Sequence, residues 1–146
     1  MFSFIRIANR IKANEGFRQN AYKDQLGNPT IGYGHLIRTK ESFFYKKRHS
    51  KETLLKIFYI DLGKAISDFK NYFDYNNLSD NEQEVIIEMI FQLGIKKVLK
   101  FKKFFYHIQK NEHHLASLEM IKSQWYQQTP KRANKLIAIL LNYDVR

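Results

Sequence analysis

The chain has 146 residues, no cysteine and a formal net charge of +11 at pH 7, with 44% hydrophobic and 15% aromatic residues. This composition suits one domain with a sizeable core, and the lack of cysteine excludes disulfide bonds, a thiolate-ligated metal and a cysteine nucleophile. The excess of 25 Lys and Arg over 14 Asp and Glu favours a polyanionic partner, and nucleic acid, an anionic membrane and an acid-decorated cell wall all fit.

Residues 1–11 predict an amphipathic helix and not a signal peptide. Arg6 and Arg10 interrupt the apolar residues, and no small-residue cleavage site follows. No stretch of the chain approaches the ~18 consecutive apolar residues of a transmembrane helix. We therefore expect a protein without a signal peptide or stable membrane insertion, made and folded in a cytoplasm.

Residues 17–34 predict a small β-hairpin. Glycine and proline interrupt any helix here, and the pairs Ala21-Tyr22 and Thr30-Ile31 suit short strands. A turn at residues 25–29 would connect the two strands. This hairpin is the centre of a predicted β-containing lobe over about residues 14–50.

Two acidic residues flank the first predicted strand. Glu15 ends an apolar periodic stretch, whereas Asp24 lies in the polar hairpin. Hydrolysis of a glycosidic bond needs two carboxyl groups in different environments, because one donates a proton while the other stays ionised. An exposed acid at a helix end and a turn-forming aspartate are the structural alternatives, and spacing alone supports both interpretations. His35 is the only histidine near this pair, in either a structural or a proton-transfer role.

Helical periodicity dominates after residue 50 and predicts a long helix over about residues 51–70, then a helical lobe over about 71–146. One of the later helices carries Leu115, Leu118 and Ile121. The expected caps and stops are Ser50, the capping box Ser79-Asp80-Asn81-Glu82, Gly94, Asn111 and the pair Thr129-Pro130.

Two further segments have alternative interpretations. Residues 96–106 interleave lysines with aromatic residues, which suits nucleic acid, although an amphipathic helix with a solvated basic face is the preferred interpretation. Residues 125–130 suit either a packed corner between helices or a sugar site. The remaining histidines show no metal-ligand spacing, so no metal site is expected.

Five blocks of the chain, in order, closely resemble the phage T4-type lysozymes, glycoside hydrolase family 24. The resemblance spans roughly residues 7–141. The blocks are Glu15-Gly16-Phe17-Arg18, Tyr22-Lys23-Asp24, Thr30-Ile31-Gly32-Tyr33-Gly34-His35, Phe91-Gln92-Leu93-Gly94 and residues 123–132.

The resemblance implies a single domain over residues 1–146 with an α+β, mostly helical, two-lobed lysozyme fold. Residues 1–13 would join the helical lobe, and the helix over about 51–70 would connect the lobes. It also implies an inverting glycosidase, an endolysin that cleaves the β-1,4 bond between N-acetylmuramic acid and N-acetylglucosamine. The catalytic residues would be Glu15, Asp24 and Thr30, and the substrate-binding residues Leu36, Gln92 and Phe101. The family histidine at His35 is mainly structural.

The same resemblance implies bacterial peptidoglycan as the partner, with no nucleic acid and no cofactor. We expect a monomer that stays in a host cytoplasm until it is released to the cell wall through a holin. Two departures affect the substrate subsites: Gln124 replaces a family arginine, and the segment 36–50 is shorter. The rival interpretations are a non-catalytic basic module that binds cell wall or nucleic acid, and a lytic transglycosylase. The second carboxylate, Asp24, counts against the transglycosylase.

Overall fold

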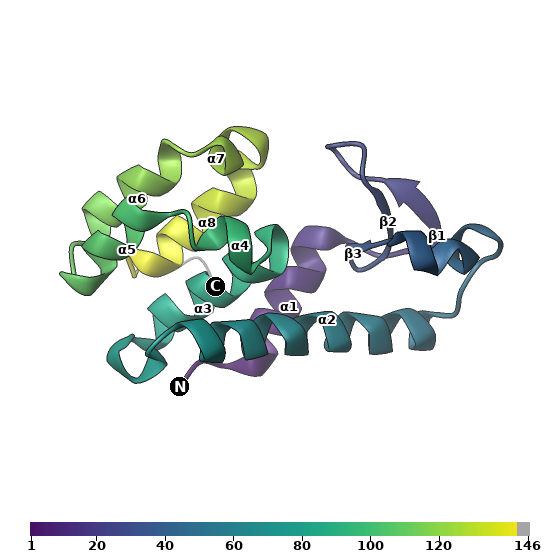
Figure 1. Cartoon of the computed structure of the whole chain (residues 1–146), viewed down its shortest axis with the longest axis horizontal. Coiled ribbons are helices and arrows are strands. Elements are labelled where there is room, and N and C mark those ends of the chain that lie inside the picture. Colours follow the sequence, from purple (N-terminus) through teal and green to yellow (C-terminus); the bar gives the residue numbers. More distant parts are fainter. Residues whose placement is uncertain (143–146) are drawn as a thin grey trace. The chain divides into compact units, whose positions relative to one another are not determined.

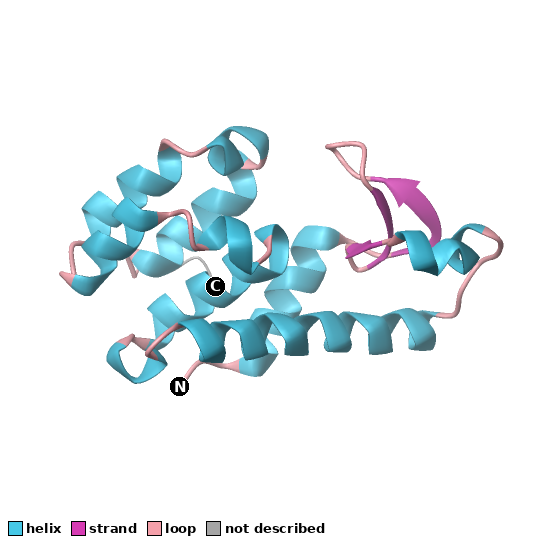
Figure 2. Cartoon of the chain, in the orientation of Figure 1, coloured by secondary structure: helices cyan, strands magenta, loops and turns pink. Residues whose placement is uncertain are grey.

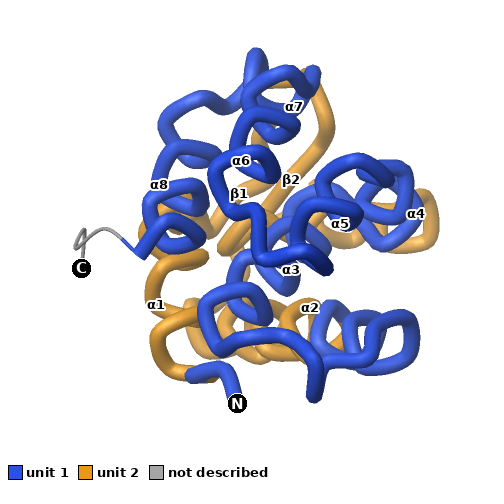
Figure 3. The backbone as a smooth tube through the Cα atoms, turned by 90° about the vertical axis from the view of Figure 1, so that its left-hand side faces the viewer, with its two compact units in different colours: residues 1–3, 65–146 blue, residues 4–64 orange. Residues whose placement is uncertain are grey.

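Helices dominate the chain, and one small sheet follows the first helix (Figures 1 and 2). The computed structural model describes residues 1–142. Residues 143–146, which the sequence analysis included in the helical lobe, lie outside the described residues. The sheet has three antiparallel strands in the order β1-β2-β3, so the predicted α+β class is confirmed. The chain divides into two compact units, one of residues 4–64 and one of residues 1–3 with the chain from residue 65 onward (Figure 3).

The unit of residues 4–64 holds the sheet and its own small core. Its elements are α1 (Phe4–Glu15), β1 (Arg18–Lys23), β2 (Pro29–Gly32), β3 (His35–Leu36), the 3-10 helix η1 (Thr39–Tyr45) and the first part of α2 (Lys51–Tyr72). The buried cluster consists of Ile31, Ile37, Phe44 and Leu54. These residues come from β2, from the position after β3, from η1 and from α2, so the cluster joins the sheet to both helical segments.

The register of the strands decides which side chains share a face of the sheet. Tyr22 of β1 lies opposite Thr30 of β2, and Thr30 lies opposite Leu36 of β3. Side chains of directly opposed residues lie on the same face, so these three form one row across the sheet. Ile31 and His35 oppose each other on the other face, where Ile31 joins the core. The register shifts between Arg18 and Tyr22.

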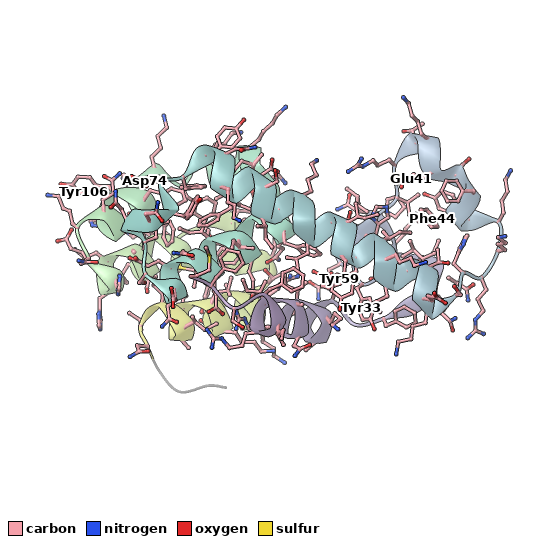
Figure 4. All side chains as sticks on the ribbon, turned by 90° about the horizontal axis from the view of Figure 1, so that it is seen from below. Tyr33, Glu41, Phe44, Tyr59, Asp74 and Tyr106 are labelled. Carbon is pink, nitrogen blue, oxygen red and sulfur yellow. The ribbon has the colours of Figure 1, made fainter. Side chains whose placement is uncertain are left out.

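The segment 36–50, for which the resemblance predicts a shortened connection, contains η1 and a loop. Phe44 anchors η1 because its side chain is 2% exposed in the core of this unit (Figure 4). Hydrogen bonds from His49 and Arg48 tie the loop to Gln19 of β1. The backbone N–H of His49 donates to the carbonyl of Gln19, and Gln19 Nε2 donates to the carbonyl of His49, both at 3.1 Å.

The long helix predicted for residues 51–70 is present as α2. Ser50 caps it, since its Oγ accepts a hydrogen bond from the Thr53 N–H at 3.1 Å. One apolar face of α2 is buried, at Leu54, Phe58, Leu62, Ala65 and Phe69.

The second unit is helical. Its elements beyond α2 are η2 (Tyr75–Asn77), α3 (Asp80–Leu93), α4 (Ile95–Val98), α5 (Lys102–Gln109), α6 (His113–Ile121), α7 (Gln124–Gln128) and α8 (Pro130–Leu140). The capping box of Ser79 and Glu82 starts α3, and Gly94 ends it at φ 84°. Pro130 is the first residue of α8, as predicted. Within residues 1–142, no helix is long and apolar enough to cross a membrane.

Helix α6 differs from the sequence-based expectation. Its N-cap is Glu112, whereas Asn111, the predicted cap, has a left-handed φ of 57°. Ala116, Ser117 and Met120 face the interior, while the apolar residues Leu115, Leu118 and Ile121 are 43%, 48% and 42% exposed. Helix α6 packs on α5, α7 and α8. The small side chains at 116 and 117 permit a close approach of these helices, and the flexible Met120 fills the remaining space.

Candidate active site

The two acidic residues singled out in the sequence occupy the ends of neighbouring elements. Glu15 is the last residue of α1 and is half-buried. Gly16 follows it at φ 69° and closes the helix, because its N–H donates to the Lys12 carbonyl at 3.0 Å. A left-handed residue at this position is a common helix end and favours glycine. Asp24 directly follows β1.

The Glu15 side chain lies directly against the backbone of Gly34, in the turn between β2 and β3. A Cβ atom on Gly34 would lie 2.5 Å from Glu15 Cδ and 2.9 Å from Cγ, so any other residue would force the Glu15 carboxyl group to move. Gly34 also has a φ of 77°. The Gly-Tyr-Gly sequence therefore brings backbone close to the Glu15 carboxyl group.

Asp24 is held in a tight turn by its own side chain. Its Oδ1 accepts hydrogen bonds from the N–H groups of Leu26 and Asn28, at 2.9 and 2.8 Å. Its backbone N–H donates to the Asn28 carbonyl at 2.9 Å, and its carbonyl accepts from Gly27 at 3.0 Å. The turn thus fixes the orientation of the carboxylate. This geometry is compatible with both the structural and the catalytic interpretation of Asp24.

Thr30 and Leu36 belong to the row that crosses the sheet. Thr30 is 4% exposed, and its hydroxyl donates to the Asn28 carbonyl at 2.9 Å, so the same turn residue orients both Thr30 and Asp24. Leu36 is 53% exposed, as suits a side chain that contacts a ligand. The structure therefore brings Thr30 and Leu36 together on one face.

Tyr22 completes this row, although no role was expected for it from the sequence. The guanidinium carbon of Arg18 lies 4.5 Å from the centre of its ring. Burial raises the pKa of Tyr22 above its ordinary value, and the Glu15 carboxylate raises it further. Arg18 opposes this rise, and the Asp24 carboxylate adds to it. The charges of both acidic residues therefore act on the Tyr22 phenol. Its position two residues before Asp24 was the available sequence signal.

His35 is buried, and both of its ring nitrogens face carboxylates. Nδ1 lies 2.7 Å from Asp61 Oδ2 on α2, and Nε2 lies 3.1 Å from Glu41 Oε1 on η1. Burial lowers the pKa of His35, but the hydrogen bonds and charges of Asp61 and Glu41 raise it overall above its ordinary value. The histidine links β3 to α2 and η1, which favours the structural interpretation. Neither carboxylate partner was identified from the sequence.

Gln92 and Phe101 lie in the helical unit, together with Trp125. Gln92 Oε1 accepts from the Trp125 indole N–H at 2.9 Å, and Gln92 Nε2 donates to Thr129 Oγ1 at 3.1 Å. The rings of Phe101 and Trp125 are 6.2 Å apart, edge to face. The motif at 125–130 is therefore a packed corner that orients the Gln92 amide, and Gln124 lies exposed at its start.

Phe101 lines an open pocket of about 410 Å³ whose rim is basic. Its other lining residues are Lys100, Lys102, Lys103, Phe104, Glu119 and Ser123. The lysines of this segment are exposed while Phe104 is buried, as the amphipathic interpretation of residues 96–106 predicts. Within residues 1–142, no three His, Asp or Glu side chains are grouped closely enough to hold a metal ion.

A family of known proteins matches the part of the chain that carries these motifs. The phage lysozyme family model matches residues 12–139, which include Glu15, Asp24, Thr30, Leu36, Gln92 and Phe101. The chain belongs to the phage lysozyme family. The predicted resemblance to T4-type lysozymes is thereby confirmed.

Three relatives contain a segment that is similar to nearly the whole of this chain. Probable T4-type lysozymes 2 and 1 of Dictyostelium discoideum are 31% and 32% identical, over 91% and 92% of this chain and 92% of each relative. The pre-baseplate central spike protein Gp5 of Enterobacteria phage T4 is 27% identical over 94% of this chain, which corresponds to 28% of that protein. The chain thus covers nearly the full length of the first two relatives.

Proposed function

We propose that this phage lysozyme family member hydrolyses the β-1,4 bond between N-acetylmuramic acid and N-acetylglucosamine in bacterial peptidoglycan. The observation that carries the proposal is the turn at Asn28, which orients both the Asp24 carboxylate and the Thr30 hydroxyl. A carboxyl group against closely packed backbone and a second carboxylate held by N–H groups form two different environments. That difference is what acid and base roles require.

In the proposed mechanism, Glu15 protonates the oxygen of the leaving sugar. Asp24 accepts a proton from a water molecule that Thr30 orients, and this water attacks the anomeric carbon from the opposite side. Hydrogen bonds from Leu26 and Asn28 keep the Asp24 carboxylate pointing in one direction. Leu36, Gln92 and Phe101 would contact the glycan. No metal or cofactor takes part in these steps.

Turbidity clearing of purified peptidoglycan tests the activity. Glu15→Gln should lower the rate by about 10²–10⁴-fold, the usual contribution of a general acid. Mass analysis of the released fragments separates the alternatives. Reducing ends with one added water support hydrolysis, whereas anhydro ends indicate a transglycosylase. Binding without cleavage by the unmodified protein would indicate a non-catalytic binding module.

Direct attack by water predicts inversion at the anomeric carbon, so the β-linked substrate should first yield the α-anomer. Proton NMR of freshly cleaved product, recorded before mutarotation, follows this directly. An initial β-anomer would mean retention and a different role for Asp24. We further propose that the protein acts as a monomer and does not bind nucleic acid, which sedimentation and gel-shift measurements test.

A further inference from the structure

Tyr22 occupies a position on the sheet that the proposed function leaves unassigned. It lies directly opposite Thr30 of β2, which in turn lies opposite Leu36 of β3. Thr30 is the proposed water-orienting residue and Leu36 a proposed glycan contact. Because opposed residues present their side chains on one face, Tyr22 faces the same side of the sheet as both. It is half-buried, so part of the side chain remains accessible to a ligand.

Arg18, on the same strand, contacts the ring of Tyr22. Arg18 lies four residues earlier in β1, and its guanidinium carbon is 4.5 Å from the ring centre. The register shift between Arg18 and Tyr22 distorts the regular alternation of the strand there. Such irregularities re-aim side chains and are frequent beside active sites. The attraction between the cation and the ring favours this orientation of the Tyr22 side chain.

The hydroxyl group of Tyr22 can donate a hydrogen bond and needs an acceptor for it. Burial raises the pKa of Tyr22 and the Glu15 and Asp24 carboxylates raise it further, so the phenol keeps its proton over the whole physiological range. Within residues 1–142, no hydrogen bond joins this hydroxyl to another protein group. An acceptor on a ligand bound at the sheet face that Tyr22 shares with Thr30 and Leu36 would complete its hydrogen bonding.

We infer that Tyr22 is a substrate-binding residue whose hydroxyl donates a hydrogen bond to the sugar bound between Glu15 and Asp24. The acceptor is a hydroxyl or acetamido carbonyl oxygen of that sugar. This inference rests on the proposed function, since it places the scissile sugar at these carboxyl groups. A neutral donor is suited to this position, because it contacts the sugar without neutralising either carboxyl group.

The test compares Tyr22→Phe with the unmodified residue in a Glu15→Gln background, which allows binding without cleavage. The probe is a soluble tetrasaccharide of alternating N-acetylglucosamine and N-acetylmuramic acid, titrated by calorimetry. Tyr22→Phe keeps the ring and its contact with Arg18 but removes the hydroxyl. Loss of one hydrogen bond between neutral groups should weaken binding by about three- to tenfold. In the background with Glu15 intact, kcat/KM should fall by at least as much.

Tyr59→Phe is the matched control. Tyr59 is 40% exposed and also has a cation over its ring, with Lys12 Nζ 5.9 Å from the ring centre. It lies on α2 and outside the row on the sheet, so its loss of a hydroxyl should leave affinity and kcat/KM unchanged. The two variants therefore separate a specific contact from a general effect of removing a phenol.

Unchanged tetrasaccharide affinity in Tyr22→Phe would overturn the inference and leave the proposed function intact. A shifted pH–rate profile with unchanged affinity would also overturn it, because the phenol would then act through the protonation of Glu15. By contrast, absence of cleavage by the unmodified protein would refute the proposed function itself. A crystal structure of Glu15→Gln with the tetrasaccharide gives a second measurement, in which the phenol oxygen should lie within about 3.2 Å of a sugar oxygen.

Discussion

The Glu15 side chain packs directly against the backbone of Gly34. A Cβ atom at position 34 would approach Glu15 Cδ to 2.5 Å, far closer than carbon atoms pack. The proposed acid is therefore oriented by the backbone of the turn between β2 and β3. The position of the Glu15 carboxyl group therefore depends on the lack of a side chain at Gly34.

Gly34→Ala should lower the rate of cleavage by about 100-fold or more. The new methyl group would push the Glu15 carboxyl group out of its position. The substitution should also destabilise the fold by about 1–2 kcal/mol, since φ is 77° at this residue. Turbidity clearing and thermal unfolding measure the two effects. Gly94→Ala is the control, because φ is 84° there but nothing lies within 4 Å of the added Cβ. With ψ at 153°, Gly94 lies in a region that is essentially restricted to glycine, so Gly94→Ala should be destabilised at least as much as Gly34→Ala but without the loss of activity.

Two substitutions separate the structural and catalytic contributions of Asp24. Asp24→Asn keeps an oxygen that can accept from Leu26 and Asn28, so the melting temperature should change little. Activity should nevertheless fall by about 10²-fold or more, because the amide does not accept a proton from water. Asp24→Ala should cost about 1 kcal/mol or more in addition. If Asp24→Asn keeps nearly full activity while Asp24→Ala loses it, the residue serves the turn alone.

The contact between His35 and Glu41 predicts a pH-dependent contribution to stability. The pKa of His35 is raised in the folded state, so its contribution is complete below the ordinary value and disappears as pH rises through the folded value. Burial alone would raise the pKa of Glu41, but the Arg38 N–H and His35 lower it overall. Its contribution is therefore present above the ordinary carboxyl value and is lost in acid. The two conditions overlap between about pH 4.5 and 6.5.

Glu41→Gln should consequently lower the melting temperature more at about pH 5.5 than at about pH 9, where His35 has lost its charge. Thermal unfolding of the variant and the unmodified protein at both values measures the difference. Glu52→Gln serves as the control, because its exposed pair with Lys56, at 3.7 Å, is screened by solvent. An equal loss at both pH values for Glu41→Gln would show that the charge of His35 is irrelevant to the contact.

Helix α6 allows a direct test of which apolar residues support the helical unit. Met120 is fully buried, so Met120→Ala should lower the free energy of unfolding by about 2–5 kcal/mol. Leu118 is 48% exposed, and Leu118→Ala should change stability by less than about 0.5 kcal/mol. Denaturant unfolding of the two variants provides the comparison. A larger loss at Leu118 than at Met120 would mean that α6 is rotated from the orientation described.

Features that depend on neighbours in the chain were determined by the sequence alone. The start of α2 after Ser50, the capping box of α3 and its end at Gly94 follow from local hydrogen bonds and backbone preferences. The hairpin between β1 and β2 follows from its glycine and proline residues. The motifs around Glu15, Asp24 and Thr30 were likewise sufficient to indicate the family and the candidate acidic residues.

Only the tertiary structure decided which distant residues meet and which helix faces are covered. The row of Tyr22, Thr30 and Leu36 depends on strand register, which a shift near Arg18 alters without any clear mark in the sequence. Asp61 and Glu41 approach His35 from different elements, through contacts that no local spacing predicts. In α6, Ala116 and Met120 are buried, whereas Leu115 and Leu118 are exposed although they are apolar. Close packing of the neighbouring helices decided which of these residues face the interior. Hydrophobicity names the candidates for burial, but the shape of the neighbouring helices selects among them.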